Sequence, residues 1–203
     1  MKPAAVGALA FAACITLAAA GPRTFVVDPA RSRALIEVGK TGAFSFAGHT
    51  HEVEAPLTSG VVHLDADAPS RSDVRLEFDP AAMRVTGAGD PPDDVPKVTG
   101  TMLGAQVLDV KRFPSIAFES TGASVKGALP SLDLQVAGRL TIHGVTRPVA
   151  APVAVRVDGD ALTATGSFAI RQTDFGIKPI SIGGLVKVRD ELHITFTIAA
   201  RER

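Results

Sequence analysis

The chain has 203 residues, with 21 Lys and Arg balanced by 21 Asp and Glu, one Cys, and neither Trp nor Tyr. Zero formal charge together with 46% apolar residues excludes a disordered chain and argues against a nucleic-acid-binding protein, which would carry a basic excess. The lack of Trp and Tyr also removes the aromatic residues that anchor spanning proteins at a membrane interface. We therefore expect a globular protein, long enough to bury a core of its own.

The first twenty residues have the features of a secretory signal peptide. Lys2 precedes an apolar run over residues 4–17, and three alanines end at Ala20. A short positive start, an apolar stretch of roughly 7–15 residues and small residues at the cleavage site define such a peptide. The run is shorter than the roughly 20 residues that a transmembrane helix needs. We expect cleavage after Ala20, a single mature domain over residues 21–203, and a periplasmic or secreted location.

Cys14 leaves a second interpretation of this segment open. A cysteine within a signal peptide can become the lipidated first residue of a lipoprotein, which would tether the protein to a membrane. Phe11 is an unfavourable residue three places before a lipidated cysteine, and the apolar run continues to Leu17. We therefore favour removal of Cys14 with the signal peptide. The exported protein then has no thiol for a disulfide or a metal site.

Most of the remaining sequence alternates between apolar and polar residues, the period of a half-buried strand. Residues 192–198 and 132–142 carry the longest such runs, and further runs surround Val74, Phe118 and Val155. About eight strands follow one another at the spacing of 8–12 residues that is typical of a sandwich or barrel. One polar, proline-rich stop over residues 90–94 precedes apolar residues at helical spacing, which predicts a short helix docked on the sheet.

A barrel is favoured over a sandwich because the apolar faces are long and two glycines interrupt them. Gly138 and Gly166 fall in the middle of strands, where a strongly coiled strand bends or bulges. Eight strands close into a barrel whose interior either is filled by side chains or holds one small ligand. The sequence pattern predicts an all-β, eight-stranded antiparallel barrel with a helical insert, and it leaves open whether the interior is hollow.

Four segments, in this order and spacing, resemble the YceI-like family. They are DPARS from Asp28, FPSIAFES from Phe113, GRLTIHGVT from Gly138 and RQTDFGI from Arg171. The resemblance extends from about Phe25 to the C-terminus. It implies a lipocalin-like barrel, usually exported, that holds an isoprenoid or another long-chain amphiphile in its pore. It implies no cofactor other than this bound lipid or quinone.

With that resemblance, the inward apolar residues become candidates for contact with a lipid tail. Burial of a tail is favourable by roughly 0.8 kcal/mol per methylene, so only the head group needs specific polar partners. For the head group we consider His49, His51 and Arg171, although Arg171 can equally pair with Asp174 to fix a loop. The apolar candidates are Ile36, Val38, Phe44, Phe46, Leu76, Phe78, Phe118, Leu140, Ile142, Phe168, Ile194 and Phe196.

The histidines also support an alternative function. His49 and His51 lie two residues apart, on one face of a strand, and turn residues near Pro56 suggest a hairpin that brings His63 alongside. Three imidazoles can ligate zinc or copper, which would make this a metal- or redox-linked periplasmic protein. No acidic or thiol fourth ligand accompanies them, so we predict no metal.

The sequence contains none of the common catalytic motifs, whether a Gly-x-Ser-x-Gly elbow, a His-Glu-x-x-His pair, a phosphate loop or a dinucleotide fingerprint. We therefore expect a binding protein rather than an enzyme. Its expected partners are an amphiphilic lipid and, transiently, a membrane, but no nucleic acid. The sequence leaves the oligomeric state open, a dimer included.

Overall fold

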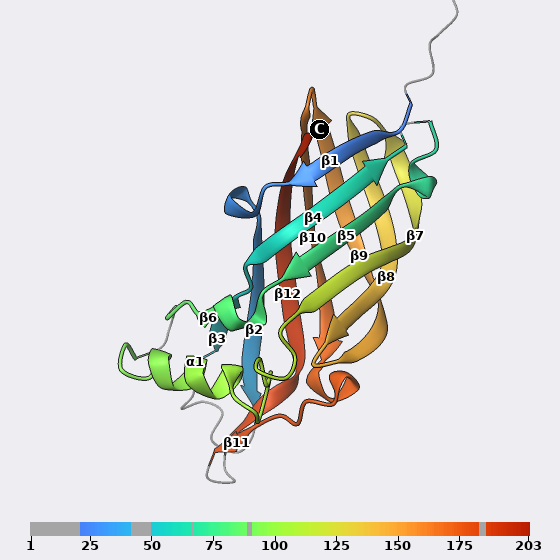
Figure 1. Cartoon of the computed structure of the whole chain (residues 1–203). Helices are drawn as coiled ribbons and strands as arrows, with labels where there is room; N and C mark the ends of the chain where they lie inside the picture. The colour runs from blue at the N-terminus through green and yellow to red at the C-terminus, as the bar shows by residue number, and fades with distance from the viewer. Residues whose placement is uncertain (1–20, 42–49, 66, 89–90, 183–185) are drawn as a thin grey trace, which may run out of the picture.

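The computed structural model describes residues 21–41, 50–65, 67–88, 91–182 and 186–203, and these form one closed β-barrel with a short helix at one end (Figure 1). The strands are β1 (Arg23–Val27), β2 (Arg33–Thr41), β3 (His51–Glu54), β4 (Leu57–Leu64), β5 (Asp73–Phe78), β6 (Arg84–Val85), β7 (Ile116–Ala128), β8 (Ser131–Ile142), β9 (Val145–Asp158), β10 (Ala161–Arg171), β11 (Ser181–Ile182) and β12 (Val186–Glu202). The α-helix is α1 (Val95–Leu103), and short 3-10 turns are η1 (Pro29–Arg31), η3 (Pro69–Arg71), η4 (Pro80–Ala82) and η5 (Gln172–Phe175).

β1 to β6 join in successive pairs into three long strands, and each of these three strands bends once at or near a proline. Pro29 in η1 separates β1 from β2, Pro56 separates β3 from β4, and Pro80 in η4 separates β5 from β6. Register confirms the pairing of like halves, since β4 pairs with β1 and β5 whereas β3 pairs with β2 and β6. Proline interrupts a ladder because it lacks an N–H donor. The three breaks therefore lie side by side and let this part of the wall turn a corner.

Closure of the barrel comes from the long last strand. β12 pairs with β10 on one side and with both β1 and β2 on the other, all antiparallel. Counting each bent pair once, eight strands close the ring, as the sequence predicts. The predicted alternation is also observed along β12, where Leu192, Ile194 and Phe196 face inward and the exposed His193 and Thr195 face outward.

The predicted helix is α1, and it lies beside an edge of the described sheet. β6 pairs only with β3 among the described strands, and α1 packs against it. Thr99 Oγ1 accepts a hydrogen bond from the backbone N–H of Val85 at 3.3 Å, so the helix supplies a partner to the strand edge. No helix within the described residues has the length and apolar character to cross a membrane.

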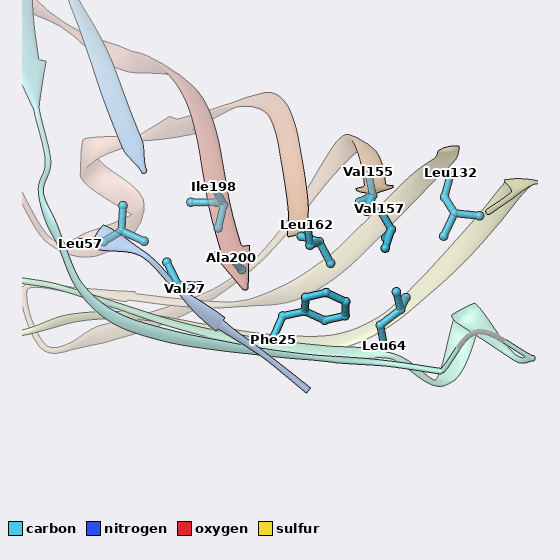
Figure 2. Packing of buried hydrophobic residues seen from close by; sticks show 10 residues of the cluster. All are labelled: Phe25, Val27, Leu57, Leu64, Leu132, Val155, Val157, Leu162, Ile198 and Ala200. Carbon is cyan, nitrogen blue, oxygen red and sulfur yellow. The ribbon is translucent and has the colours of Figure 1, made fainter. Parts of the chain in front are cut away.

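One end of the barrel is closed by a packed apolar plug (Figure 2). Its members come from β1, β4, β8, β9, β10 and β12, most of them toward the end where the β7–β8 and β9–β10 hairpins lie, and Phe25, Leu132 and Leu162 are at most 2% exposed. We call this the hairpin end. The opposite end, where β2 finishes and α1, β11 and η5 lie, we call the helix end. The plug comprises Phe25, Val27, Leu57, Leu64, Leu132, Val155, Val157, Leu162, Ile198 and Ala200.

Candidate functional site

Between the plug and the helix end, the barrel is hollow. A cavity of about 690 Å³ lies inside it, and apolar side chains from all eight strands of the ring form almost the whole lining. Phe78, Phe118, Phe168 and Phe196 point inward yet remain only partly buried, because each borders the open space of the cavity. The structure thus decides the question that the sequence left open in favour of a hollow interior.

Eleven of the fifteen predicted ligand-binding residues line this cavity. They are Ile36, Val38, His51, Leu76, Phe78, Phe118, Leu140, Ile142, Phe168, Ile194 and Phe196. Phe44, Phe46 and His49 lie outside the described residues. Arg171 is exposed and does not belong to the lining, because it follows the inward Ile170 and so faces outward.

Gly138 keeps one of these aromatic rings against the wall. A Cβ at this position would meet two ring carbons of Phe118 and would lie 2.6 Å from the backbone oxygen of Glu119. Only glycine leaves that space, so the ring of Phe118 lies where another residue would have its side chain. A register shift between Ser120 and Gly122 on the neighbouring strand accompanies it, as expected for a bulge near a strand glycine.

Polar side chains enter the lining together at the helix end. Along β2 the inward residues Ala34, Ile36 and Val38 are followed by Lys40, and His51 lies opposite Val38 on β3. The lining also includes Asp94 and Lys97 from the start of α1, and Gln172 from η5. Lys97 Nζ lies 3.2 Å from Asp94 Oδ1. The apolar tunnel therefore ends in a polar mouth that carries two lysines.

Neither lysine is among the residues predicted from the sequence to bind a ligand. Lys40 continues the period-two series of Ala34, Ile36 and Val38, so its inward direction could have been inferred from the alternation alone. Lys97 could not, because its place depends on how α1 docks against β6, which the sequence does not specify.

A bulge in β12 fixes the turn beside this mouth. The register shifts between Val188 and Leu192, which frees Arg189 and Asp190 from the ladder. Gln172 Nε2 donates to the carbonyl oxygen of Arg189 at 2.8 Å, and Thr173 donates its backbone N–H and its hydroxyl to the two carboxylate oxygens of Asp190 at 2.9 and 2.7 Å. The two bonds from Thr173, that of its hydroxyl first, lower the pKa of Asp190 below its ordinary value of 3.8. The carboxylate therefore holds η5 in place as an anion.

The lining has a second polar region, where β5 and β7 diverge. Ser72, Asp73 and Ser120 border the cavity there, and Ser120 Oγ accepts the backbone N–H of Val74 at 2.9 Å. The carboxylate of Asp73 lies 3.1 Å from Nδ1 of His63. This region presents a carboxylate, whereas the helix end presents lysines.

The predicted approach of His63 to His51 is wrong. Pro56 does not form a hairpin turn; it bends one long strand, so that His51 on β3 and His63 on β4 lie on successive halves of the same strand. His51 lines the cavity, while His63 pairs with Asp73 and does not line it. Among the residues that the structure describes, no group of three or more His, Cys, Asp or Glu side chains is placed to hold a metal ion. The alternative metal-linked function therefore has no support in the structure.

The model of the YceI-like domain matches residues 25–200. The chain belongs to the YceI-like family. No protein with a curated description matches the sequence.

Solved structures of this family share the fold. BcnA of Burkholderia cenocepacia is 22% identical to this chain, and the two superpose with a TM-score of 0.65. The match covers 85% of this chain and 98% of the BcnA chain. A polyisoprenoid-binding domain from Saccharophagus degradans, implicated in plant cell wall breakdown, is 10% identical over 88% of this chain and 98% of its own, with a TM-score of 0.62. The YceI protein of Campylobacter jejuni is 14% identical, and the match covers 81% of this chain and 84% of the Campylobacter chain, with a TM-score of 0.52. At these identities the structures establish the barrel fold of this YceI-like chain and not its ligand.

Proposed function

We propose that this YceI-like protein binds one long-chain amphiphile, an isoprenoid lipid, a quinone or a similar molecule, inside the barrel. The cavity of about 690 Å³ carries the proposal. Its size falls within the roughly 300–1,000 Å³ of typical small-molecule sites, and its lining is apolar over most of its length. The structural similarity to a domain described as polyisoprenoid-binding supports the same ligand class.

Binding of this kind acts by shielding the tail from water. Each methylene that leaves water contributes roughly 0.8 kcal/mol, so a long tail gives affinity without a specific polar partner. Most of the backbone of the described strands is hydrogen-bonded to a neighbouring strand, so the wall presents the tail mainly with apolar side chains. The protein would thus sequester or carry the amphiphile without converting it chemically, exchanging it during transient contact with a membrane.

Export belongs to the same proposal. An isoprenoid or quinone that crosses an aqueous compartment needs a carrier, and the first twenty residues have the composition of a cleaved signal peptide. Intact mass measurement on protein recovered from the periplasm or the medium tests this. The expected mature chain begins at Gly21, and a chain that retains residue 2 and remains in the cytoplasm would contradict export.

Organic extraction of the gently purified protein, followed by mass spectrometry, tests the ligand. We expect a stoichiometric hydrophobic species, and we expect the delipidated protein to enhance the fluorescence of N-phenyl-1-naphthylamine, a neutral apolar probe. A clean extract together with no probe uptake would refute the carrier function.

A further inference from the structure

We propose that the helix end binds an anionic head group, so that the preferred ligand is an amphiphile with a phosphate or carboxylate and not a neutral quinone or alcohol. The inference rests on the proposed function. It names the head-group chemistry, the end of the barrel at which the head lies, and the two residues that recognise it, Lys40 and Lys97.

The position of Lys40 is the first observation. It occupies the last inward position of β2, directly after the apolar wall residues Ala34, Ile36 and Val38. An inward lysine on a barrel wall has an aliphatic stem that can cover apolar surface and an ammonium that must reach a polar partner or water. Within the described part of the chain no carboxylate forms an ion pair with Lys40, which leaves its charge available to a ligand.

The second observation is the neighbourhood of that lysine. β2 pairs with β3, β3 pairs with β6, and α1 packs on β6, so α1 lies at the end of the barrel where β2 finishes (Figure 1). Lys97 of α1 lines the cavity, and so does His51, the diagonal neighbour of Lys40 on the inner face. Asp94 is the one described carboxylate in the lining here, and it pairs with Lys97. Among the described lining residues at this end, two ammonium groups and one carboxylate leave a net positive charge.

The charge of the other polar region fixes the orientation of the ligand. Where β5 and β7 diverge, the ionisable lining residue is Asp73, whose carboxylate would repel an anionic head. The hairpin end is closed by the plug. A single-tailed anion therefore lies with its tail toward the plug and its head at Lys40 and Lys97. A hydrogen bond between an ammonium and a phosphate or carboxylate oxygen is stronger than one between neutral groups, and it is stronger still beside a low-dielectric tunnel.

Three probes with the same C16 tail and different heads test this, each displacing N-phenyl-1-naphthylamine at concentrations below its solubility limit or critical micelle concentration. Hexadecyl phosphate is expected to bind about tenfold or more tighter than hexadecanol, and hexadecyltrimethylammonium more weakly than both. Inorganic phosphate alone is expected to displace nothing, because it lacks the tail. Displacement by inorganic phosphate would instead identify a free-anion site and overturn the head-group assignment.

Variants identify the residues. Lys40→Met keeps the aliphatic stem and removes the charge, and it is expected to abolish most of the preference for hexadecyl phosphate over hexadecanol. Lys97→Met is expected to reduce the preference less, because Lys97 already has Asp94 as a partner. Lys187→Met removes an exposed lysine of β12 that does not line the cavity, and it is the matched control.

Equal affinity of the wild-type protein for hexadecyl phosphate and hexadecanol would overturn the inference without touching the carrier function. An unchanged preference in Lys40→Met and Lys97→Met would do the same. Failure of all three C16 probes and of the fluorescent probe would instead refute the carrier function itself. The wild-type comparison needs no variant to fold.

Discussion

The ring of Phe196 lies over the Cα of Gly166, its cross-strand partner. A Cβ on Gly166 would come within 2.6 Å of Cζ of Phe196 and within 2.5 Å of the carbonyl oxygen of Pro152. The ring of Phe168 meets Phe196 edge-on, with 6.3 Å between centroids. The missing side chain at 166 thus lets the ring lie against the wall and leaves the bore open.

Gly166→Ala is expected to lower the free energy of unfolding by about 1–3 kcal/mol, because a backbone oxygen and a ring must both move to admit the methyl group. Gly122→Ala is the matched control, since Gly122 is also a strand glycine but has no atom within 4 Å of the added Cβ. Its change is expected to stay within about 0.5 kcal/mol. Urea unfolding of both variants measures the difference, and equal effects would show that the ring does not need the glycine.

The barrel itself could be predicted from the sequence, because the alternation of apolar and polar residues has the period of a strand and can be recognised without knowing which strands pair. The helix after residues 90–94 and the strand-interrupting Gly138 and Gly166 were predicted on the same local grounds. The positions of the apolar lining residues follow from alternation as well, which is why those in the described residues do line the cavity.

Features that depend on how separate segments meet could not be predicted. The three proline bends were not recognised as one corner, because their alignment depends on register, and Pro56 was therefore misread as a hairpin that joins His63 to His51. The hollow interior depends on the volume between strands, which no single strand encodes. To predict that Lys40 and Lys97 both line the cavity, one would need to know which side chains of β2 face inward and also how α1 packs against β6.

Ala164→Phe is expected to fill part of the bore and to weaken binding of hexadecyl phosphate and hexadecanol alike. Ala164 faces the cavity, so the ring takes the space of about two methylenes of tail, worth at least about tenfold in affinity at roughly 0.8 kcal/mol each. Ala154→Phe places the same ring on the exposed outer face of the neighbouring strand and should bind as the wild type does. Probe displacement measures both, and equal affinities would mean that the tail lies elsewhere.

Gly100→Ala is expected to stabilise the protein by about 0.5–1 kcal/mol. Gly100 lies within α1, an added Cβ meets no atom within 4 Å, and alanine loses less backbone freedom on folding than glycine does. Gly87→Ala provides the contrast, because its φ of +81° strains any other residue and should make that variant less stable. Thermal unfolding distinguishes the two, and a destabilised Gly100→Ala would indicate that the helix packs differently.

Acid is expected to destabilise the protein through Asp190. Its hydrogen bonds from Thr173 lower the pKa of the folded carboxyl below 3.8, so the folded state favours the anion. The stability that the Asp190 anion contributes is complete above the pKa of this group in the unfolded chain and is lost as the pH falls through its lower pKa in the folded protein. The loss therefore lies below pH 3.8. The pKa of Asp65, beside Arg71, and of Glu202, beside Arg23, is lowered in the same direction and adds to the slope.

Asp190→Asn isolates one part of that slope. The amide keeps the shape of the carboxylate and one acceptor for Thr173 but cannot titrate, so the variant is expected to be less stable at neutral pH, by under about 1 kcal/mol for a partly solvated group, and to lose less stability on acidification. Asp133→Asn removes a charge from the exposed outer face and controls for net charge. Urea unfolding over a pH series that extends below 3.8 measures both variants. If the free energy of unfolding of Asp190→Asn and of the wild type fell equally with decreasing pH, the negative charge of Asp190 would not contribute to holding η5 beside the mouth.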